Sequence, residues 1–139
     1  YLGDPQTWAQ TIEGIERVQS RWQTFGYGWW SMFIKDTDTL IGAACLQNLA
    51  HVENAPLEIG WRLIPAYQGH GYATEAGQAA MDFGFERVGV DYICAVADPE
   101  NTPSQNVMKR LGMTYVGMQT HYDVPCAYYD IHKGSRNAV

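Results

Sequence analysis

The pattern of apolar and polar positions divides the chain into alternating helical and extended segments. Apolar residues recur at helical spacing between about residues 5 and 25, and again between about residues 72 and 88. Runs that alternate in polarity or are mostly apolar occupy 28–35, 40–49, 57–64 and 91–97. Two more extended runs, 114–120 and 126–133, follow a short helix that ends at Gly112. These segments predict one α+β domain.

The connections between the extended runs predict how the strands pair. The polar turn Asp36–Asp38 joins the runs at 28–35 and 40–49 into a hairpin. The runs at 57–64 and 91–97 are separated by a long helix, so we expect them to pair in parallel through a right-handed crossover. The predicted sheet is therefore mixed and mostly antiparallel, with one parallel pair and helices on both faces.

Helix boundaries follow from capping residues. Asp4 can cap the first helix, and Pro5 suits its first position. The apolar residues of this helix fall mostly on one face: Trp8, Ile12, Ile15 and Trp22. Gly26 can close its end. Thr102 as a cap and Pro103 at the first position begin the short helix in the same way. Separately, Gly134–Val139 is expected to be a frayed tail.

Composition and charge narrow the class of ligand. The 139 residues are enough for one domain with a real core. A net charge of −6 argues against nucleic acid, which needs a basic face, and is compatible with a cationic amine substrate. Three scattered cysteines without C-x-x-C spacing predict no zinc site and reduced thiols in a cytoplasmic protein. No apolar run reaches the roughly 18 residues of a membrane span, and no signal-like segment is visible.

The stretch Gln68–Glu75 lies between the strand at 57–64 and the long helix. Glycines let a backbone come close to a ligand, and a helix N-terminus favours negative charge, so such a turn binds pyrophosphate well. No Gly-Lys-Ser/Thr end of a P-loop is present, and Thr74 replaces the third glycine of the dinucleotide motif. The pattern that fits is Q/R-x-x-G-x-G/A, read as Gln68, Gly71 and Ala73. Alone, it also suits a surface turn that binds nothing.

This pattern resembles the acyl-CoA pyrophosphate loop of the GNAT superfamily of N-acetyltransferases. Glu58–Trp61 and Pro65–Tyr67 resemble the strand and turn that precede the loop in that family. Gly71–Ala76 resembles the branch that contains the ribosomal-protein alanine N-acetyltransferases. Downstream, Asn101–Ser104 and Leu111–Met113 resemble the family's asparagine, second helix and Gly-Phe end, with Met for Phe. The resemblance covers about residues 30 to 120.

The resemblance implies a single acyl-CoA N-acyltransferase domain over residues 1–139. GNAT domains usually begin with a strand before the first helix, and we expect that strand to be missing here. The two parallel strands would splay apart and admit pantetheine. The implied reaction transfers acetyl from acetyl-CoA directly to a primary amine, on a protein N-terminus or a small molecule, without a metal. The alternative is a non-catalytic acyl-CoA sensor. The acceptor's identity and the oligomeric state stay open, a homodimer included.

The resemblance also implies which residues hold the donor, mostly through backbone groups. They are Leu63, Gln68, Gly69, His70, Gly71, Tyr72, Ala73, Asn101 and Ser104. His70 either meets a phosphate or is solvated. Glu75, in the first helical turn, is interpreted as structural because a carboxylate there suits the helix dipole.

Amine acetylation needs a base, because an aliphatic amine titrates near pH ~10. We assign this role to Glu58, directly or through water; the alternative is a structural carboxylate bonded to a neighbouring strand. Many family members carry a tyrosine seven residues after the asparagine, where this chain has Met108, which cannot donate a proton. Ser104, one turn earlier, is predicted to hydrogen-bond the leaving thiolate; the alternatives are solvent as the acid and Ser104 as a packing residue.

In the resembling family the first helix, the loop at 50–56 and the last hairpin build the acceptor pocket. Trp22 and Phe25 therefore either line this pocket or anchor the core. His51, in the loop, is interpreted as solvated rather than as a base.

Overall fold

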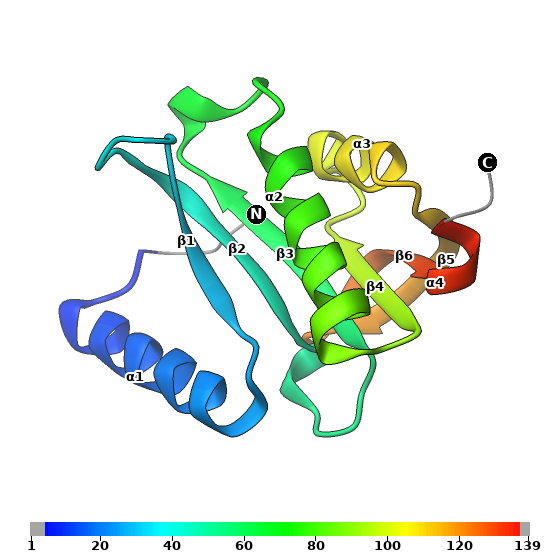
Figure 1. Ribbon diagram of the computed structural model, residues 1–139, viewed down its shortest axis with the longest axis horizontal. Helices are drawn as coiled ribbons and strands as arrows, with labels where there is room; N and C mark the ends of the chain where they lie inside the picture. The colour runs from blue at the N-terminus through cyan, green and yellow to red at the C-terminus, as the bar shows by residue number, and fades with distance from the viewer. Residues whose placement is uncertain (1–4, 137–139) are drawn as a thin grey trace.

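The computed structural model describes residues 5–136 and contains one six-stranded sheet, with strand order β1-β2-β3-β4-β6-β5 (Figure 1). The strands are β1 (Trp29–Phe33), β2 (Leu40–Asn48), β3 (Leu57–Leu63), β4 (Tyr92–Ala97), β5 (Thr114–His121) and β6 (Val124–His132). All neighbours are antiparallel except β3 and β4. The predicted fold class is confirmed.

The helices are α1 (Trp8–Phe25), α2 (Tyr72–Asp82), α3 (Thr102–Arg110) and α4 (Lys133–Arg136). Short 3₁₀ turns, η1 (Leu49–His51) and η2 (Pro65–Tyr67), flank β3, and a π-helical segment, η3 (Phe83–Val88), continues α2. Hydrophobic periodicity does not distinguish this wider segment from the α-helix predicted there. Within residues 5–136, no helix combines the length and apolar character needed to cross a membrane.

The parallel strands β3 and β4 separate soon after they meet. They pair at only two positions, Leu57 with Ile93 and Glu58 with Cys94. Beyond Glu58, β3 continues to Leu63 paired with β2 alone, while β4 pairs with β6. The edge of β3 that faces β4 therefore has no strand partner beyond Glu58, as expected for a splayed pair.

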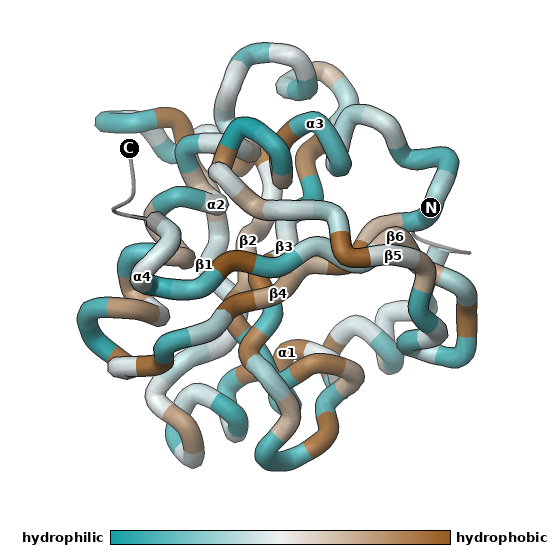
Figure 2. The backbone as a smooth tube through the Cα atoms, turned by 90° about the vertical axis from the view of Figure 1, so that its right-hand side faces the viewer, coloured by the Kyte–Doolittle hydropathy of each residue, from teal (hydrophilic) through white to brown (hydrophobic). Residues whose placement is uncertain are grey.

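The main core lies on the face of the sheet covered by α2, η3 and α3. It includes Leu46 from β2, Ile59 from β3 and Phe85 from η3. Small residues let α2 approach closely, because a Cβ on Gly77 would lie 2.8 Å from Leu111 Cδ1. A smaller cluster around Leu49, Cys94 and Tyr128 lies on the opposite face. Apolar stretches run through the middle of the molecule along the strands (Figure 2).

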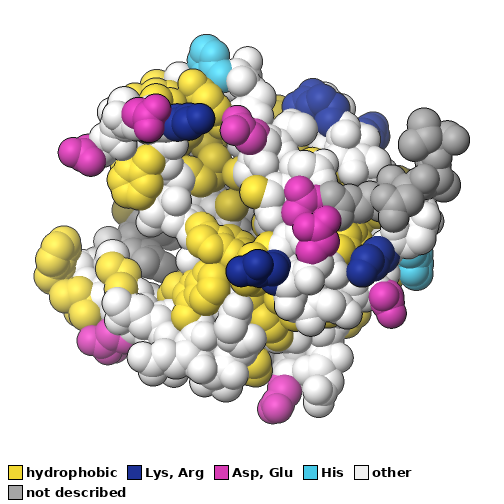
Figure 3. All heavy atoms as spheres, viewed as in Figure 1, with side chains coloured by type: hydrophobic (Ala, Val, Ile, Leu, Met, Phe, Trp, Pro, Cys, Tyr) yellow, Lys and Arg dark blue, Asp and Glu magenta, His cyan; other side chains and the backbone are white. Residues whose placement is uncertain are grey.

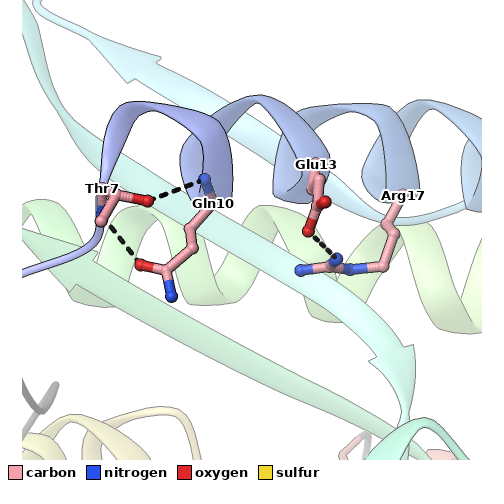
Figure 4. Close-up of polar contacts among 4 residues, drawn as sticks. All are labelled: Thr7, Gln10, Glu13 and Arg17. Carbon is pink, nitrogen blue, oxygen red and sulfur yellow. Dashed lines mark hydrogen bonds and ion pairs between the residues drawn. The ribbon is translucent and has the colours of Figure 1, made fainter.

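The predicted start of α1 is wrong. Asp4 lies outside the described residues, and the helix begins at Trp8 rather than at Pro5. Thr7 is the N-cap: its hydroxyl accepts from Gln10 N at 3.2 Å, and Gln10 Oε1 accepts from Thr7 N at 2.8 Å (Figure 4). This reciprocal capping box satisfies two backbone donors at once, which favours the later start. The helix ends at Gly26, with φ 73°, as predicted.

The apolar face of α1 is largely uncovered, as Figure 3 shows. Trp8 is 80% exposed, and no residue of α1 is fully buried. Contact with the sheet is made at the C-terminal end, where Trp22 packs edge-on against Trp30 at 5.1 Å and donates from Nε1 to Trp29 O at 2.9 Å. The shared apolar face that helical spacing predicts is therefore packed on β1 at Trp22 and exposed at Trp8.

Two further boundaries differ from the expectation. Asn101, not Thr102, caps α3, and its Oδ1 accepts from Ser104 N at 3.3 Å. Residues 133–136, predicted to lie largely in a frayed tail, form α4, with Lys133 N bonded to Asp91 O at 2.9 Å; residues 137–139 lie outside the described chain. No strand precedes α1 within residues 5–136, and the missing first strand stays a prediction.

Candidate active site

The loop between η2 and α2 has the backbone shape of an anion cradle. Gly69 and Gly71 are left-handed, with φ 79° and 83°, and no atom lies within 4 Å of a Cβ placed on either. Gly71 is the N-cap of α2, so the unpaired N–H groups of the first turn open onto this free surface. Gln68 folds back and donates from Nε2 to Leu63 O at 3.4 Å. Gln68, Leu63 and the glycines thus form one surface.

The other residues predicted to bind the acyl-CoA lie in two places. Around the loop, His70 is exposed, and its ring lies 5.9 Å from that of Tyr72, while Ala73 is half-buried. Asn101 and Ser104 lie at the start of α3, but α3 touches the first turn of α2 near its other end, through Arg110 Nε and Thr74 Oγ1 at 3.3 Å. No hydrogen bond of the described residues joins Asn101 or Ser104 to the loop.

Glu58 is buried at the point where β3 and β4 separate. Its side chain is 5% exposed and accepts a hydrogen bond at Oε1 from Gln47 Nε2 at 3.0 Å, across the β2–β3 pair. Burial raises the pKa of Glu58 to about 7, and the bond from Gln47 opposes that rise. A carboxyl group with this pKa exchanges protons readily near neutral pH, as a general base must.

Sequence reasoning missed three side chains: Gln47, which contacts Glu58, and Trp29 and Tyr122, which contact Gln47. Gln47 also donates from Nε2 to Tyr122 Oη at 3.2 Å and accepts at Oε1 from Trp29 Nε1 at 3.1 Å. The only sequence signal was that Gln47 interrupts an apolar strand. Tyr122, in the β5–β6 turn, lies far along the chain, so no local pattern indicates this contact.

A cavity of about 200 Å³ adjoins this group of residues. Its lining includes Arg21, Phe25, Tyr27, Trp29, His51 and Glu53. The first helix and the loop at 50–56 therefore meet in one cavity, with Gln47 also in its wall. Phe25 lines it and stacks on Tyr27 at 5.6 Å, whereas Trp22 packs on Trp30.

The remaining candidates have more ordinary surroundings. Glu75 is exposed in the first turn of α2. Met108 is 2% exposed and belongs to the core. The pKa of His51 is lowered by partial burial and by the nearby Arg21 and Arg17 guanidinium groups. Burial raises the pKa of the thiols Cys45, Cys94 and Cys126, to about 12 for Cys94, so all three are neutral near pH 7.

The family model described as "Acetyltransferase (GNAT) domain" matches residues 1–114. The chain belongs to the GNAT acetyltransferase family. Among curated proteins it is similar to the uncharacterized N-acetyltransferase YnaD of Bacillus subtilis, with 40% identity over 86 residues, or 62% of this chain. That match spans only 49%, about half, of the relative's length.

Solved structures show the same fold. The acetyltransferase from Agrobacterium tumefaciens superposes with a TM-score of 0.80 at 25% identity, covering 95% of this GNAT chain and 76% of the other. The ribosomal-protein-S5-alanine acetyltransferase from Vibrio fischeri superposes with a TM-score of 0.70 at 18% identity, covering 93% and 77%. The branch indicated by the sequence is thus among the structural neighbours.

The raised pKa of Glu58 predicts a pH-dependent stability. Between its unfolded value of 4.5 and about 7, the folded GNAT domain keeps a proton on Glu58 that the unfolded chain has lost. The resulting stabilisation, of the order of 3 kcal/mol, is complete below about pH 4.5 and is lost as the pH rises through about 7. Because Glu58→Gln does not titrate, urea unfolding should show its stability relative to wild type increasing from about pH 5 to about pH 8. A stability difference that is the same at both pH values would contradict the assignment.

Proposed function

We propose that this GNAT domain transfers an acetyl group from acetyl-CoA to a primary amine, on a protein N-terminus or a small molecule. The observation that carries the proposal is the separation of β3 and β4 immediately after the buried Glu58. This opening lies at one end of the strand whose other end leads, through η2, to the left-handed glycine loop. A thioester donor held at the loop and along the open edge of β3 would bring its acetyl group toward Glu58.

The loop residues fit the donor's pyrophosphate. The open left-handed positions at Gly69 and Gly71 let backbone N–H groups of residues 69–74 approach an anion without a lysine. Gln68, His70, Tyr72 and Ala73 complete the loop surface, and Leu63 ends the open edge of β3. When bound, acetyl-CoA supplies the activated acetyl thioester.

Glu58 accepts the proton of the attacking amine in this proposal. Near neutral pH a substantial fraction of a carboxyl group with a pKa of about 7 is ionised and ready to accept it. Gln47 occupies Oε1, and the second oxygen serves the amine or a bridging water. Formation of the C–N bond then accompanies cleavage of the C–S bond, and the thiolate takes up a proton.

Ser104 is proposed to donate a hydrogen bond to that thiolate. Asn101 and Ser104 are also proposed to bind the far side of acetyl-CoA. Ser104 lies in the first turn of α3, where the helix dipole favours negative charge. Met108, at the position of the family's tyrosine, is in the core and donates nothing. If Ser104 does not act, solvent is the acid.

The acceptor is proposed to enter the cavity between α1 and η1. Its aromatic walls, Phe25, Tyr27 and Trp29, suit the apolar part of an amine-bearing molecule. The protein-N-terminus option is supported by the ribosomal-protein-S5-alanine acetyltransferase, whose name specifies a protein alanine. The match to YnaD covers about half of that protein's length, so the relative does not establish the acceptor, and the acceptor is proposed here.

A non-catalytic acyl-CoA sensor is the second candidate, favoured by Met108, which cannot donate a proton where many family members carry a tyrosine. Release of thiol from acetyl-CoA, measured with a panel of amines and N-terminal peptides, separates the two. An enzyme gives acceptor-dependent thiol release and a product heavier by one acetyl group. A sensor binds CoA without turnover, and a structural domain binds no CoA.

Gly71→Val tests the donor loop. A β-branched side chain at this left-handed position should block the backbone's approach to pyrophosphate and weaken CoA binding at least tenfold by calorimetry. Gly89→Val is the matched control, because Gly89 has φ 86° and equally open surroundings but ends η3. Both variants should lose similar stability, and unchanged CoA affinity in folded Gly71→Val would remove the loop from the site.

Ser104→Ala tests the proposed thiolate donor. A hydrogen bond to a charged acceptor contributes about 1.5–3 kcal/mol, so turnover should fall roughly ten- to hundredfold with CoA affinity nearly intact. Stability should hardly change, because the cap of α3 uses the backbone N–H of Ser104. Thr102→Ala, in the same turn, is the control and should retain turnover. Wild-type turnover in Ser104→Ala would leave water as the acid.

A further inference from the structure

Gln47 and Glu58 are the two buried polar or charged side chains of the described residues. They face each other across β2 and β3, 8% and 5% exposed. A buried carboxylate is costly unless hydrogen bonds compensate for lost water. Among the hydrogen bonds of residues 5–136, the one from Gln47 is the side-chain bond that Glu58 receives.

The orientation of the Gln47 amide is fixed by its third partner. The indole N–H of Trp29 is a donor only, so the group facing it must be the amide oxygen. The NH₂ group must then point the other way, toward Glu58 Oε1 and Tyr122 Oη. Both amide hydrogens are used, and a flipped Gln47 would lose the bond from Trp29 and turn its oxygen toward the Glu58 carboxylate.

The second amide hydrogen connects the site to the β5–β6 turn. Tyr122 and Asp123 in this turn are left-handed, with φ 54° and 62°. Tyr122 Oη accepts from Gln47 at 3.2 Å, and its ring lies edge-on to His51, at 5.8 Å, beside the cavity. The turn is thereby held against the proposed acceptor side, and the phenol's own proton remains available for another acceptor.

We propose that Gln47 is a positioning residue whose single amide both orients the Glu58 carboxylate and holds the β5–β6 turn at the acceptor site. This inference rests on the proposed function, since it assigns Gln47 to the base of that reaction. It goes beyond that function by naming a residue that acts through Glu58 and Tyr122 rather than on the reacting atoms.

The inference requires that Gln47, rather than another group, stabilises ionised Glu58. The titratable groups that interact electrostatically with Glu58 are the thiols Cys45 on β2, Cys94 on β4 and Cys126 on β6. Burial keeps these thiols neutral. From the turn, Tyr122 reaches Glu58 only through Gln47, and on β3 itself Arg62 stacks over the Trp29 ring at 4.5 Å. Loss of the Gln47 donor should therefore favour protonated Glu58.

Gln47→Met tests the link to Glu58. The pKa of Glu58, followed by ¹³C NMR of its carboxyl carbon, should rise by about one to two units. The acidic limb of the kcat/KM profile should move to higher pH by the same amount, with a roughly five- to fiftyfold loss near pH 7 that recovers at high pH. The matched control is Gln78→Met, which removes a 3.0 Å amide–carboxylate bond to Asp82 on α2 and should move neither curve.

Tyr122→Phe tests the link to the turn. It removes only the bond that Gln47 gives to the turn, so the acceptor KM should rise severalfold while the acidic limb stays in place. If Gln47→Met does not fold, Gln47→Glu keeps the shape and the bond from Trp29, and its added carboxylate should raise the Glu58 pKa further.

The outcomes separate the inference from the proposed function. If the wild-type protein turns over, and neither Gln47→Met nor Gln47→Glu moves the acidic limb of its kcat/KM profile, only the role of Gln47 is overturned. A loss of turnover equal at every pH also overturns it, because a purely structural role gives that result. An unchanged acceptor KM in Tyr122→Phe overturns the role of Gln47 in holding the turn. A wild-type protein without acceptor-dependent turnover overturns the proposed function and the inference together.

Discussion

The separation of β3 from β4 is the constraint on which the rest of the molecule depends. Where two strands part inside a sheet, the N–H and C=O groups that face the gap need water or a ligand as partners, because such groups are costly when buried and unpaired. Here β3 is paired with β2 along its whole length, and β4 with β6 along its own. These two antiparallel pairings keep β3 and β4 apart beyond the two positions at which they pair in parallel. The main core closes one face of this arrangement, under α2, η3 and α3.

Glu58 places a buried carboxyl group with a raised pKa beside the opening between β3 and β4. The residue takes part in the last parallel pair, so its carboxyl group is buried by the sheet yet adjoins the gap. Burial raises its pKa to about 7, and the amide of Gln47 limits the rise. The fold sacrifices stability to keep this group, since a buried carboxyl ionises with difficulty and contributes less to the folded state as the pH rises. Such a feature is typical of a functional site.

The sequence indicated those features whose signals are local. Alternation predicted the strands, the helix between two apolar runs predicted the parallel pair, and the spacing of Gly71 and Ala73 predicted the loop. The start of α1 was misassigned because Asp4 and Thr7 are both good caps, and only Thr7 has Gln10 three residues later. The exposure of Trp8 could not be predicted, because helical spacing indicates a shared face and not whether anything covers it.

Other features depend on contacts between distant segments, which one sequence does not encode in any local pattern. Gln47 meets Tyr122 only because β2 and the β5–β6 turn converge over Glu58. Likewise, α1 and η1 enclose a cavity that no motif marks. The donor-binding residues and the catalytic roles of Glu58 and Ser104 stay predictions.

The central claim is that the buried carboxyl group of Glu58 accepts the proton of the attacking amine. The most direct measurement is the rate of acetyl transfer from acetyl-CoA to an amine accepted by the wild-type protein, compared with the rate for Glu58→Gln at saturating donor. The glutamine keeps the size of the side chain and its contact with Gln47 but accepts no proton. The account predicts a loss of about a hundredfold or more, with CoA affinity unchanged by calorimetry. A Glu58→Gln protein that transfers acetyl at close to the wild-type rate would contradict it.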